Sequence, residues 1–238
     1  MKYSAAEGDG AVKWTRFPIR VRPHRNPLSD TDDTHPDGPA SVPWPEMFPQ
    51  LPPEIVVRWA DIGSAYGGML CRMGLLDPNV AMLGLEIRHK VVEFAQSRVL
   101  ESRAVAGELH NVWFAQCNVM RFLPFWFSKG QLTKMFFCYP DPHFKRAHQR
   151  RRVMGQNLVA EYAYVMARGG RLYTVSDVAE LEQWMCAQLN AASMLFRRLT
   201  EEETAVDGLL EMAVHVSEDA VRSQRKGAEK HYAIYERL

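Results

Sequence analysis

The sequence predicts an α/β protein with one doubly wound, mostly parallel sheet behind an extended amino-terminal arm. Strand-like and helix-like segments alternate from Ile55 onward. Repeated βα units of this kind favour parallel strands with helices on both faces of the sheet. Two late strands, Phe196–Thr200 and Tyr232–Arg237, are expected to complete the sheet, and the closing strand is expected to be antiparallel. With 238 residues, 47% of them hydrophobic, the chain is long enough to bury a sizeable core.

Residues 1–54 form the predicted arm, and the domain is expected to span residues 55–238. The second half of the arm is crowded with prolines and lacks apolar periodicity, which favours an extended segment outside the packed core. These prolines are Pro36, Pro39, Pro43, Pro45, Pro49, Pro52 and Pro53. Earlier in the arm, a basic group from Arg20 to Arg25 precedes Asn26-Pro27. That group is either a second phosphate contact or a solvated tail.

Inside the domain, apolar runs and helical periodicity place the remaining elements in order. The predicted strands are Val56–Ile62, Val80–Leu85, Val112–Cys117, Lys134–Tyr139 and Arg171–Val175. The predicted helices are Gly68–Leu76, Arg88–Ala104, Met120–Phe127, Leu158–Met166 and Val178–Asn190. The longest helix has apolar residues at Val91, Val92, Ala95 and Val99. This spacing gives one buried helical face.

The net charge and the cysteine spacing indicate which kinds of partner and site to expect. The net charge is only +1, so the basic run from Lys145 to Arg152 is a local patch on a neutral body. Such a patch suits a partner with a defined docking site. The four cysteines lie far apart, which matches neither a disulfide framework nor a zinc site. We expect no metal, no membrane span and no secretory signal, and a location in the nucleus or cytoplasm.

The stretch from Met135 to Arg152 carries the clearest sign of chemistry. An apolar strand ends at Pro140-Asp141-Pro142, and the ring of Phe144 and the basic run follow. Two prolines fix the backbone on either side of Asp141, so its carboxylate should point in a defined direction. Ligands of open α/β sheets bind at the carboxyl ends of strands. The stretch therefore predicts a catalytic acid beside a polyanion-binding surface. The alternative is a plain turn followed by a solvated face or a nuclear-import signal.

Three other strand ends predict a nucleotide-like cofactor. The first strand runs into the glycine turn from Asp61 to Gly68, and Glu86 lies 23 residues after Gly63. A carboxylate at this distance can accept hydrogen bonds from ribose hydroxyls. The third strand ends at Asn118, whose amide suits an adenine edge. The set fits a dinucleotide or S-adenosylmethionine, and acidic Asp61 favours the latter because it suits a cationic amine. Otherwise the glycines form a plain turn and Glu86 a surface salt bridge.

These motifs resemble the eukaryotic tRNA (guanine-N7-)-methyltransferases, from about His24 to the carboxyl terminus. The most specific stretches are ADIGSAYGG, LGLEIRHKV, KGQLTKMFFCYPDPHFKR, AEYAYV and LYTVSDV. The resemblance implies a Rossmann-like class I methyltransferase sheet and S-adenosylmethionine as cofactor. It also implies methyl transfer to N7 of a variable-loop guanosine in tRNA. The family usually has a glycine where this chain has Ala65, so the turn is expected to be tighter or shifted.

The resemblance also implies roles for individual residues. Asp141 takes the catalytic position, with Lys145 and Asp177 near the guanine. The implied cofactor-binding residues are Gly63, Glu86, Ile87, Arg88, Asn118, Val119, Cys138, Ser217, Glu218 and Asp219. The implied phosphate contacts on tRNA are Lys145, Arg146, Arg150, Arg151 and Arg152.

A partner and three rival functions complete the predictions. The eukaryotic relatives work with a WD-repeat propeller subunit, and the predicted docking face includes Glu180, Glu182, Trp184 and Met185. Trp184 is either an aromatic anchor for that partner or a residue that faces the core. One rival is a methyltransferase acting on an exocyclic base amine, because Asp141-Pro142-His143-Phe144 is similar to the DPPY-type loop of those enzymes. Another is a non-catalytic RNA-binding subunit that keeps the fold. The third, a nicotinamide-dependent dehydrogenase, is supported only by the glycine turn.

Overall fold

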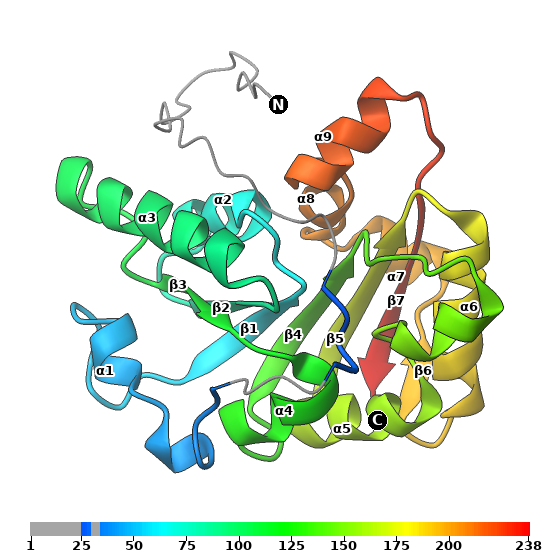
Figure 1. Ribbon diagram of the computed structural model, residues 1–238, viewed down its shortest axis with the longest axis horizontal. Coiled ribbons are helices and arrows are strands. Elements are labelled where there is room, and N and C mark those ends of the chain that lie inside the picture. The colour runs from blue at the N-terminus through cyan, green and yellow to red at the C-terminus, as the bar shows by residue number, and fades with distance from the viewer. Residues whose placement is uncertain (1–24, 30–33) are drawn as a thin grey trace.

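The computed structural model describes residues 25–29 and 34–238, which form a seven-stranded sheet between two layers of helices (Figure 1). The strand order is β3-β2-β1-β4-β5-β7-β6. The strands are β1 (Val57–Ile62), β2 (Ala81–Glu86), β3 (Val112–Gln116), β4 (Leu132–Cys138), β5 (Met166–Ser176), β6 (Phe196–Arg198) and β7 (His231–Arg237). Strands β1 to β5 pair in parallel, and β7 runs antiparallel to both of its neighbours. The predicted doubly wound sheet with an antiparallel closing strand is confirmed.

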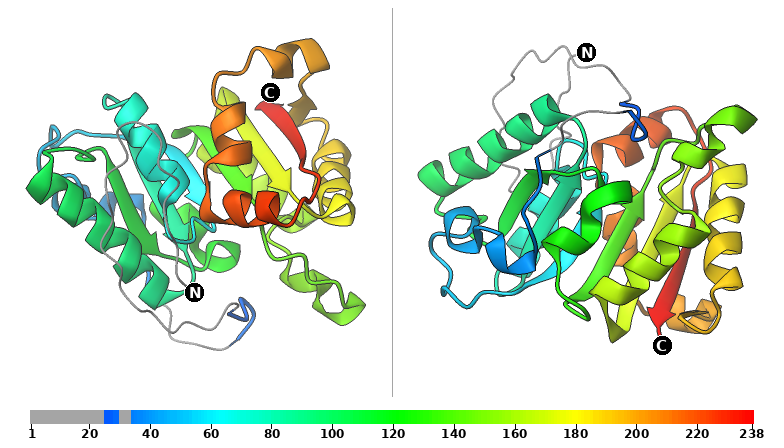
Figure 2. Two further views of the ribbon diagram at one scale, coloured as in Figure 1. Left: turned by 90° about the horizontal axis from the view of Figure 1, so that it is seen from above. Right: turned by 60° about the horizontal axis from the view of Figure 1, so that its bottom comes forward.

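Helices cover both faces of this sheet (Figure 2). One face packs against α4 (Val119–Trp126), α5 (Gln156–Val165) and α6 (Ala179–Ala191). The other face packs against α2 (Gly68–Leu76), α3 (His89–Val105) and α8 (Leu210–His215). No helix in the described part of the chain is both long and apolar enough to cross a membrane.

Strand β4 shows why a continuous apolar run becomes the middle of this sheet. Met135 and Phe137 are fully buried in the core under α4, α5 and α6. Phe136, between them, is fully buried in the opposite core and stacks on Tyr173 of β5 with ring centroids 4.7 Å apart. Successive residues of a strand point to opposite faces, so a strand covered on both sides needs apolar residues at every position.

The structure extends β5 beyond the predicted segment. The strand runs from Met166 to Ser176, whereas the sequence predicted Arg171–Val175 and assigned Met166 to the preceding helix. Its pairing with β4 shifts register between Leu132 and Lys134, and Gly169 has a φ of 77°. The Gly169-Gly170 pair therefore forms a bulge within the strand rather than a break before it.

Three short helices between β6 and β7 were not predicted. They are α7 (Glu201–Ala205), α8 and α9 (Glu218–Arg225). Thr200 caps α7, because its hydroxyl accepts from Glu203 N at 3.2 Å and Glu203 Oε2 accepts from Thr200 N at 2.8 Å. This reciprocal pair is a capping box that the sequence does carry. It explains why the strand predicted as Phe196–Thr200 ends earlier, at Arg198.

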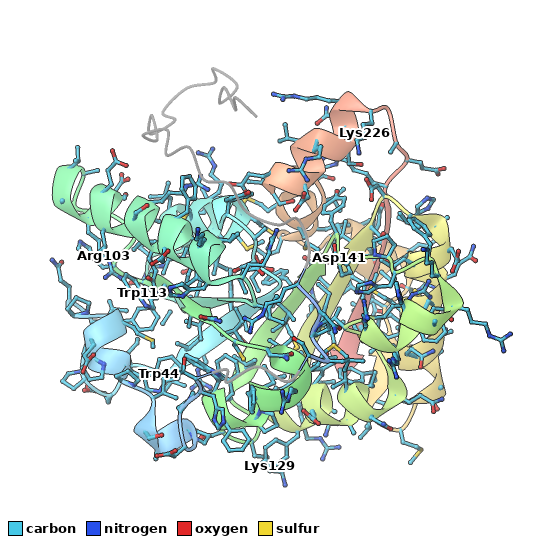
Figure 3. All side chains as sticks on the ribbon, in the orientation of Figure 1. Trp44, Arg103, Trp113, Lys129, Asp141 and Lys226 are labelled. Carbon is cyan, nitrogen blue, oxygen red and sulfur yellow. The ribbon has the colours of Figure 1, made fainter. Side chains whose placement is uncertain are left out.

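The prediction that the arm takes no part in the core is wrong for Val42 and Phe48, which are 5% and 0% exposed. They lie at the 3-10 helix η1 (Pro39–Ser41) and at α1 (Trp44–Met47). Arg103 of α3 fixes this segment by donating to Met47 O at 2.9 Å, and its guanidinium lies 4.9 Å from the Trp113 ring (Figure 3). Residues 1–24, with the predicted basic group up to His24, lie outside the described residues.

The parallel strands bring the predicted chemical groups to one edge of the sheet. Ile62 of β1 pairs with Leu85 of β2, and Glu86 pairs with Gln116 of β3. The ends of β1, β2 and β3 therefore lie side by side, and β4 and β5 end at the same edge. Helix α9 lies at this edge, at the top of Figure 1.

Candidate active site

The turn after β1 leaves open space above one glycine. Gly63 has a φ of 79° and its N–H donates to Leu85 O at 2.8 Å. A methyl group on its Cα would meet no atom within 4 Å. By contrast, a Cβ at Gly67 would lie 2.3 Å from Phe114, and one at Gly68 would lie 2.6 Å from the Glu218 carboxylate. Gly67 and Gly68 thus serve packing, whereas Gly63 leaves room for a ligand to approach the backbone.

Ala65 keeps the glycine-type conformation of this turn. Its φ is 46°, and it lies between Gly63 and Gly67, which are also left-handed. A non-glycine residue in this region costs about 1–2 kcal/mol. The alanine therefore strains the turn locally, and residues 63, 65 and 67 all keep left-handed conformations.

The floor of the site is acidic. Asp61 and Glu86 are each 4% exposed, at the ends of β1 and β2. Burial, together with the nearby carboxylates of Glu218 and Glu86, raises the pKa of Asp61 to about 8. Arg98 of α3 partly balances this charge by pairing with Glu218 at 2.5 Å. A site with clustered carboxylates favours a cationic ligand, because a cation restores the ionised form of Asp61.

Arg88 orients Glu86. Glu86 Oε1 accepts from Arg88 N at 2.9 Å and from Arg88 Nε at 3.1 Å, and Oε2 accepts from Arg88 Nη2 at 3.0 Å. A carboxylate has about four acceptor positions, so Oε2 retains capacity for a ribose hydroxyl. The structure therefore brings the predicted residues Glu86 and Arg88 together, and Arg88 holds the Glu86 carboxylate through these hydrogen bonds.

Residues 25–29 lie over the ends of β2 and β3. Arg25 Nη1 donates to Ile87 O at 2.7 Å, and Asn118 Nδ2 donates to Pro27 O at 2.7 Å. Asn118 Oδ1 and Ser64 Oγ are buried, and neither has a hydrogen-bond partner among the described residues. Buried polar atoms are normally satisfied. These two orphaned atoms, with the open space at Gly63 and the acidic floor, fit a nucleoside that carries a positive charge.

Helix α9 brings the predicted late segment to the site. Ser217 caps the helix through Oγ, which accepts from Ala220 N at 3.0 Å. Glu218 Oε2 accepts from Gly68 N at 3.2 Å at the start of α2. Asp219 pairs with Arg222 at 2.6 Å. Burial raises the pKa of Asp219, and Arg88 and Asp141 are among the charges that act on it. Glu218 and Asp219 thus face the site, whereas the Ser217 hydroxyl serves the cap.

Asp141 lies on the loop that follows β4 (Figure 3). Tyr139 and His143, on either side of the Pro140–Pro142 triplet, have φ values of 54° and 44°. Non-glycine residues in this region are uncommon and cluster at functional sites.

Three other predicted residues lie near this loop or at the neighbouring strand ends. Before the loop, Cys138 contacts Met69, with the two sulfur atoms 3.8 Å apart. Asp177, directly after β5, lies close enough to Tyr139 that its charge adds to burial in raising the pKa of the Tyr139 hydroxyl. Val119 starts α4 and packs in the core.

The basic run forms the 3-10 helix η2 (Arg146–Arg151). Lys145, directly before η2, and Arg146 and Arg150 within it are exposed, and Arg151 is half-buried. Arg152 differs, because it is only 3% exposed and its side chain pairs with Glu180 of α6. Its predicted role as a phosphate contact is therefore corrected: the guanidinium points into the protein.

The predicted docking face on α6 also needs correction. Glu182 and Met185 are buried, and Thr174 of β5 donates to Glu182 Oε1 at 2.7 Å. Trp184 is partly buried, with Nε1 donating to Met154 O at 2.8 Å. Of the four residues, only Glu180 is exposed. The charged and apolar residues after Asp177 suggested an outer face, but the carboxyl group of Glu182 lies inside the fold and accepts from Thr174.

Sequence reasoning missed two contributors to the site. Arg98 lies inside a helix whose charged positions look solvated, and no motif marks it as the partner of Glu218. Tyr139 was read only as the end of a strand, although its place before Pro140 restricts its backbone. The spacing of residues cannot reveal the contact of Arg98, since its partner lies 120 residues away.

Comparison with known proteins agrees with this geometry. A family model described as "Putative methyltransferase" matches residues 56–233. A Drosophila yakuba protein is 40% identical over 222 residues, covering 92% of this chain and 86% of its own length. An Arabidopsis thaliana protein is 39% identical, covering 92% and 90%. Both bear the name tRNA (guanine-N(7)-)-methyltransferase. With this identity over nearly its whole length, the chain belongs to the tRNA (guanine-N(7)-)-methyltransferase family.

Proposed function

We propose that this protein transfers a methyl group from S-adenosylmethionine to N7 of a guanosine in the variable loop of tRNA. The observation that carries the proposal is the meeting of two features at one sheet edge. One is the group of buried carboxylates at Asp61 and Glu86, which suits a cationic nucleoside. The other is Asp141 on its proline-braced loop, whose charge acts on Asp219 of the same site. The named relatives in fruit fly and Arabidopsis support the choice of tRNA guanine as substrate.

The residues at the strand ends would hold the cofactor as follows. Gly63 leaves space for close approach of the backbone, and Glu86 would accept hydrogen bonds from the ribose. Asn118 Oδ1 offers a buried acceptor at the end of β3. Asp61 and Glu218 supply negative charge for the amino group. When bound, S-adenosylmethionine supplies a methyl group activated by a sulfonium centre.

Asp141 would act on the guanine by orientation and charge. Guanine N7 already carries a lone pair, so the reaction needs no strong base. N7 forms a bond to the methyl carbon as the carbon–sulfur bond breaks, the bonding pair stays on sulfur, and no proton is transferred. Positive charge then develops on the imidazole ring of the base. A preorganised carboxylate stabilises that charge, and fixed alignment of the reacting atoms lowers the barrier further.

The exposed cations of η2 would hold the RNA. Lys145, Arg146 and Arg150 stand out from the surface a few residues after Asp141. Phosphate contacts of this kind give affinity and orientation rather than base identity. Lys145, on the same loop as Asp141, and Asp177, directly after the neighbouring strand β5, are proposed to lie near the guanine.

A WD-repeat propeller subunit and a nuclear location belong to the same proposal. A chain of this size with one local basic patch offers little area for an L-shaped tRNA. A second subunit would enlarge the surface that binds RNA. The exposed cations of η2 also have the composition of a nuclear-import signal. A fluorescent fusion in eukaryotic cells, compared with a variant in which Lys145, Arg146 and Arg150 are neutralised, would test the location.

The direct test is methyl transfer to unmodified tRNA by the purified chain, with and without a propeller subunit. Nucleoside analysis of the product should show N7-methylguanosine, and activity should rise when the propeller is present. Methyl groups on exocyclic amines would support the rival base methyltransferase. Cofactor binding without any transfer, even with the propeller, would support a non-catalytic RNA-binding subunit.

A further inference from the structure

The loop that carries Asp141 is fastened at both ends by side chains. Tyr139 precedes the Pro140–Pro142 triplet and is anchored to α8. Pro142 closes the triplet and is held by Arg152, ten residues later. The two fasteners come from different sides of the loop, so together they fix its position relative to the sheet edge.

Tyr139 forms the first attachment. Its N–H donates to Val175 O at 2.7 Å, and its hydroxyl donates to Val214 O at 2.6 Å. Burial raises the pKa of this hydroxyl, so it remains a donor throughout the physiological pH range. Val214 belongs to α8, three residues before Ser217 caps α9. The attachment therefore links the Asp141 loop to the segment that places Glu218 and Asp219.

Arg152 forms the second attachment. Its Nε donates to Pro142 O at 2.9 Å, and its Nη2 pairs with Glu180 Oε1 at 2.9 Å. The guanidinium carbon lies 4.9 Å from the centre of the Trp184 ring. Glu180 and Trp184 lie one turn apart on α6, so Arg152 joins the loop to that helix. A rigid, forked guanidinium can serve all three partners at once, which an ammonium group cannot.

These attachments hold a backbone that would otherwise relax. Tyr139 and His143 both take left-handed conformations, with φ values of 54° and 44°. Conformations of this kind persist only where the surrounding structure over-determines them. The strained residues lie next to the two attachment points, on either side of Asp141.

We infer that Arg152 and Tyr139 are positioning residues that hold Asp141 in line with the reacting methyl group. The inference rests on the proposed function for its kinetic consequences. A misplacement of about 1 Å at a reacting centre can cost about 100-fold in rate. Loss of either attachment therefore lowers kcat, whereas loss of a phosphate contact raises KM and weakens the dependence on salt.

The test compares Arg152→Ala and Arg152→Lys with Arg150→Ala, an exposed arginine of the same segment. Arg152→Ala should lower kcat by about 10- to 100-fold, with the salt dependence of tRNA binding as in the wild type. Arg152→Lys should not restore kcat, because it keeps the charge but loses the fork. Arg150→Ala should raise KM and reduce the salt slope by about 0.7–0.9. A raised KM and reduced slope for Arg152→Ala, rescued by lysine, would overturn the inference.

Two more conservative variants test the inference in case Arg152→Ala does not fold. Tyr139→Phe removes only the hydroxyl, and Glu180→Gln removes only the charge of a carboxylate whose side chain is 60% exposed. Both should lower kcat and leave KM for tRNA near the wild-type value. Native turnover by both variants would overturn the inference even if Arg152→Ala failed to fold.

A measurement without substrate separates this inference from the proposed function. The N–H of residue 139 donates to Val175 O, so its hydrogen exchange reports opening of the loop. This exchange should be faster in Tyr139→Phe and Glu180→Gln than in the wild type, because the loop opens more often. Exchange at an unrelated strand such as β2 should stay the same. Unchanged exchange in the loop overturns the inference, whatever the activity. Failure of the wild type to methylate tRNA, with faster loop exchange in the variants, would overturn only the proposed function.

Discussion

The carboxylate of Glu218 accepts a hydrogen bond from the backbone N–H of Gly68 at 3.2 Å, across 150 residues of sequence. The same carboxylate pairs with Arg98 of α3, whose Nη1 also donates to Tyr66 O at 2.7 Å. One acidic side chain of α9 thus fastens the glycine turn, the start of α2 and the middle of α3. The lack of a Cβ at Gly68 is what allows this approach.

Glu218→Gln should destabilise the protein and weaken cofactor binding. Glutamine can still accept from Gly68 N, but the charge opposite Arg98 is lost. Hydrogen bonds to charged groups contribute about 1.5–3 kcal/mol, so the free energy of unfolding should fall by a similar amount. Urea unfolding of both proteins measures this difference. Glu229→Gln, on an exposed loop residue, is the matched control. Equal stability of the two variants would show that the contact with Arg98 contributes nothing.

Asp61 should make cofactor binding depend on pH. Its pKa of about 8 means that it is mostly protonated at neutral pH, owing to burial and the nearby Glu218 and Glu86. A cationic ligand favours the ionised carboxylate, so affinity should rise between about pH 6 and pH 8 and a proton should be released on binding. Calorimetry in buffers of different ionisation enthalpy measures that proton. Asp61→Asn should flatten this pH dependence, and equal slopes in both proteins would contradict the assignment.

The same shift predicts the pH dependence of stability. The unfolded Asp61 has a pKa near 3.8 and the folded one near 8, so the folded state binds more protons between these values. The contribution of Asp61 to stability therefore falls as pH rises from about 4 to 8. Denaturant unfolding at several pH values should show a steeper decline in the wild type than in Asp61→Asn. Parallel declines would show that the carboxyl is not shifted.

Ala65→Gly should stabilise the turn after β1. Ala65 takes a φ of 46°, which glycine adopts without strain. Relief of that strain is offset in part by the greater freedom of glycine in the unfolded chain, leaving a gain of up to about 1 kcal/mol. Thermal unfolding should register a rise of about 2–4 °C for a gain of that size. The contrasting variant Gly63→Ala should lower stability, since its φ of 79° strains any other residue. A lower melting temperature for Ala65→Gly would show that the alanine is not strained.

Asp141→Asn should lower kcat by about 100- to 1,000-fold while cofactor affinity stays within a few-fold. Removing one preorganised electrostatic group from a reacting centre has an effect of this size. Asparagine preserves the volume of the side chain and removes its charge. Single-turnover kinetics at saturating tRNA separates the chemical step from binding. Near-native turnover by this variant would remove Asp141 from the catalytic role.

Local sequence patterns predicted the sheet and the location of the site. The apolar run of β4 and the glycine turn after β1 mark strand ends, and parallel strands must bring those ends to one edge. The burial of Arg152, directly after η2, was not predictable in this way. Arg152 follows Lys145, Arg146, Arg150 and Arg151 and looks like one more surface charge, yet its side chain contacts Glu180 and Trp184 of α6 inside the protein. Tertiary contacts of this kind depend on helix placement, which periodicity alone does not determine.

In the proposed reaction, N7 of a tRNA guanosine receives the methyl group. A tRNA with 7-deazaguanosine at the single variable-loop position has a C–H in place of the N7 lone pair and keeps the exocyclic amine. Together with its guanosine counterpart and the propeller subunit, it should be assayed for transfer of labelled methyl groups. We predict full labelling of the guanosine tRNA and only background labelling of the 7-deaza tRNA, with equal binding of both. Equal labelling of the two tRNAs would show that N7 is not the methyl acceptor.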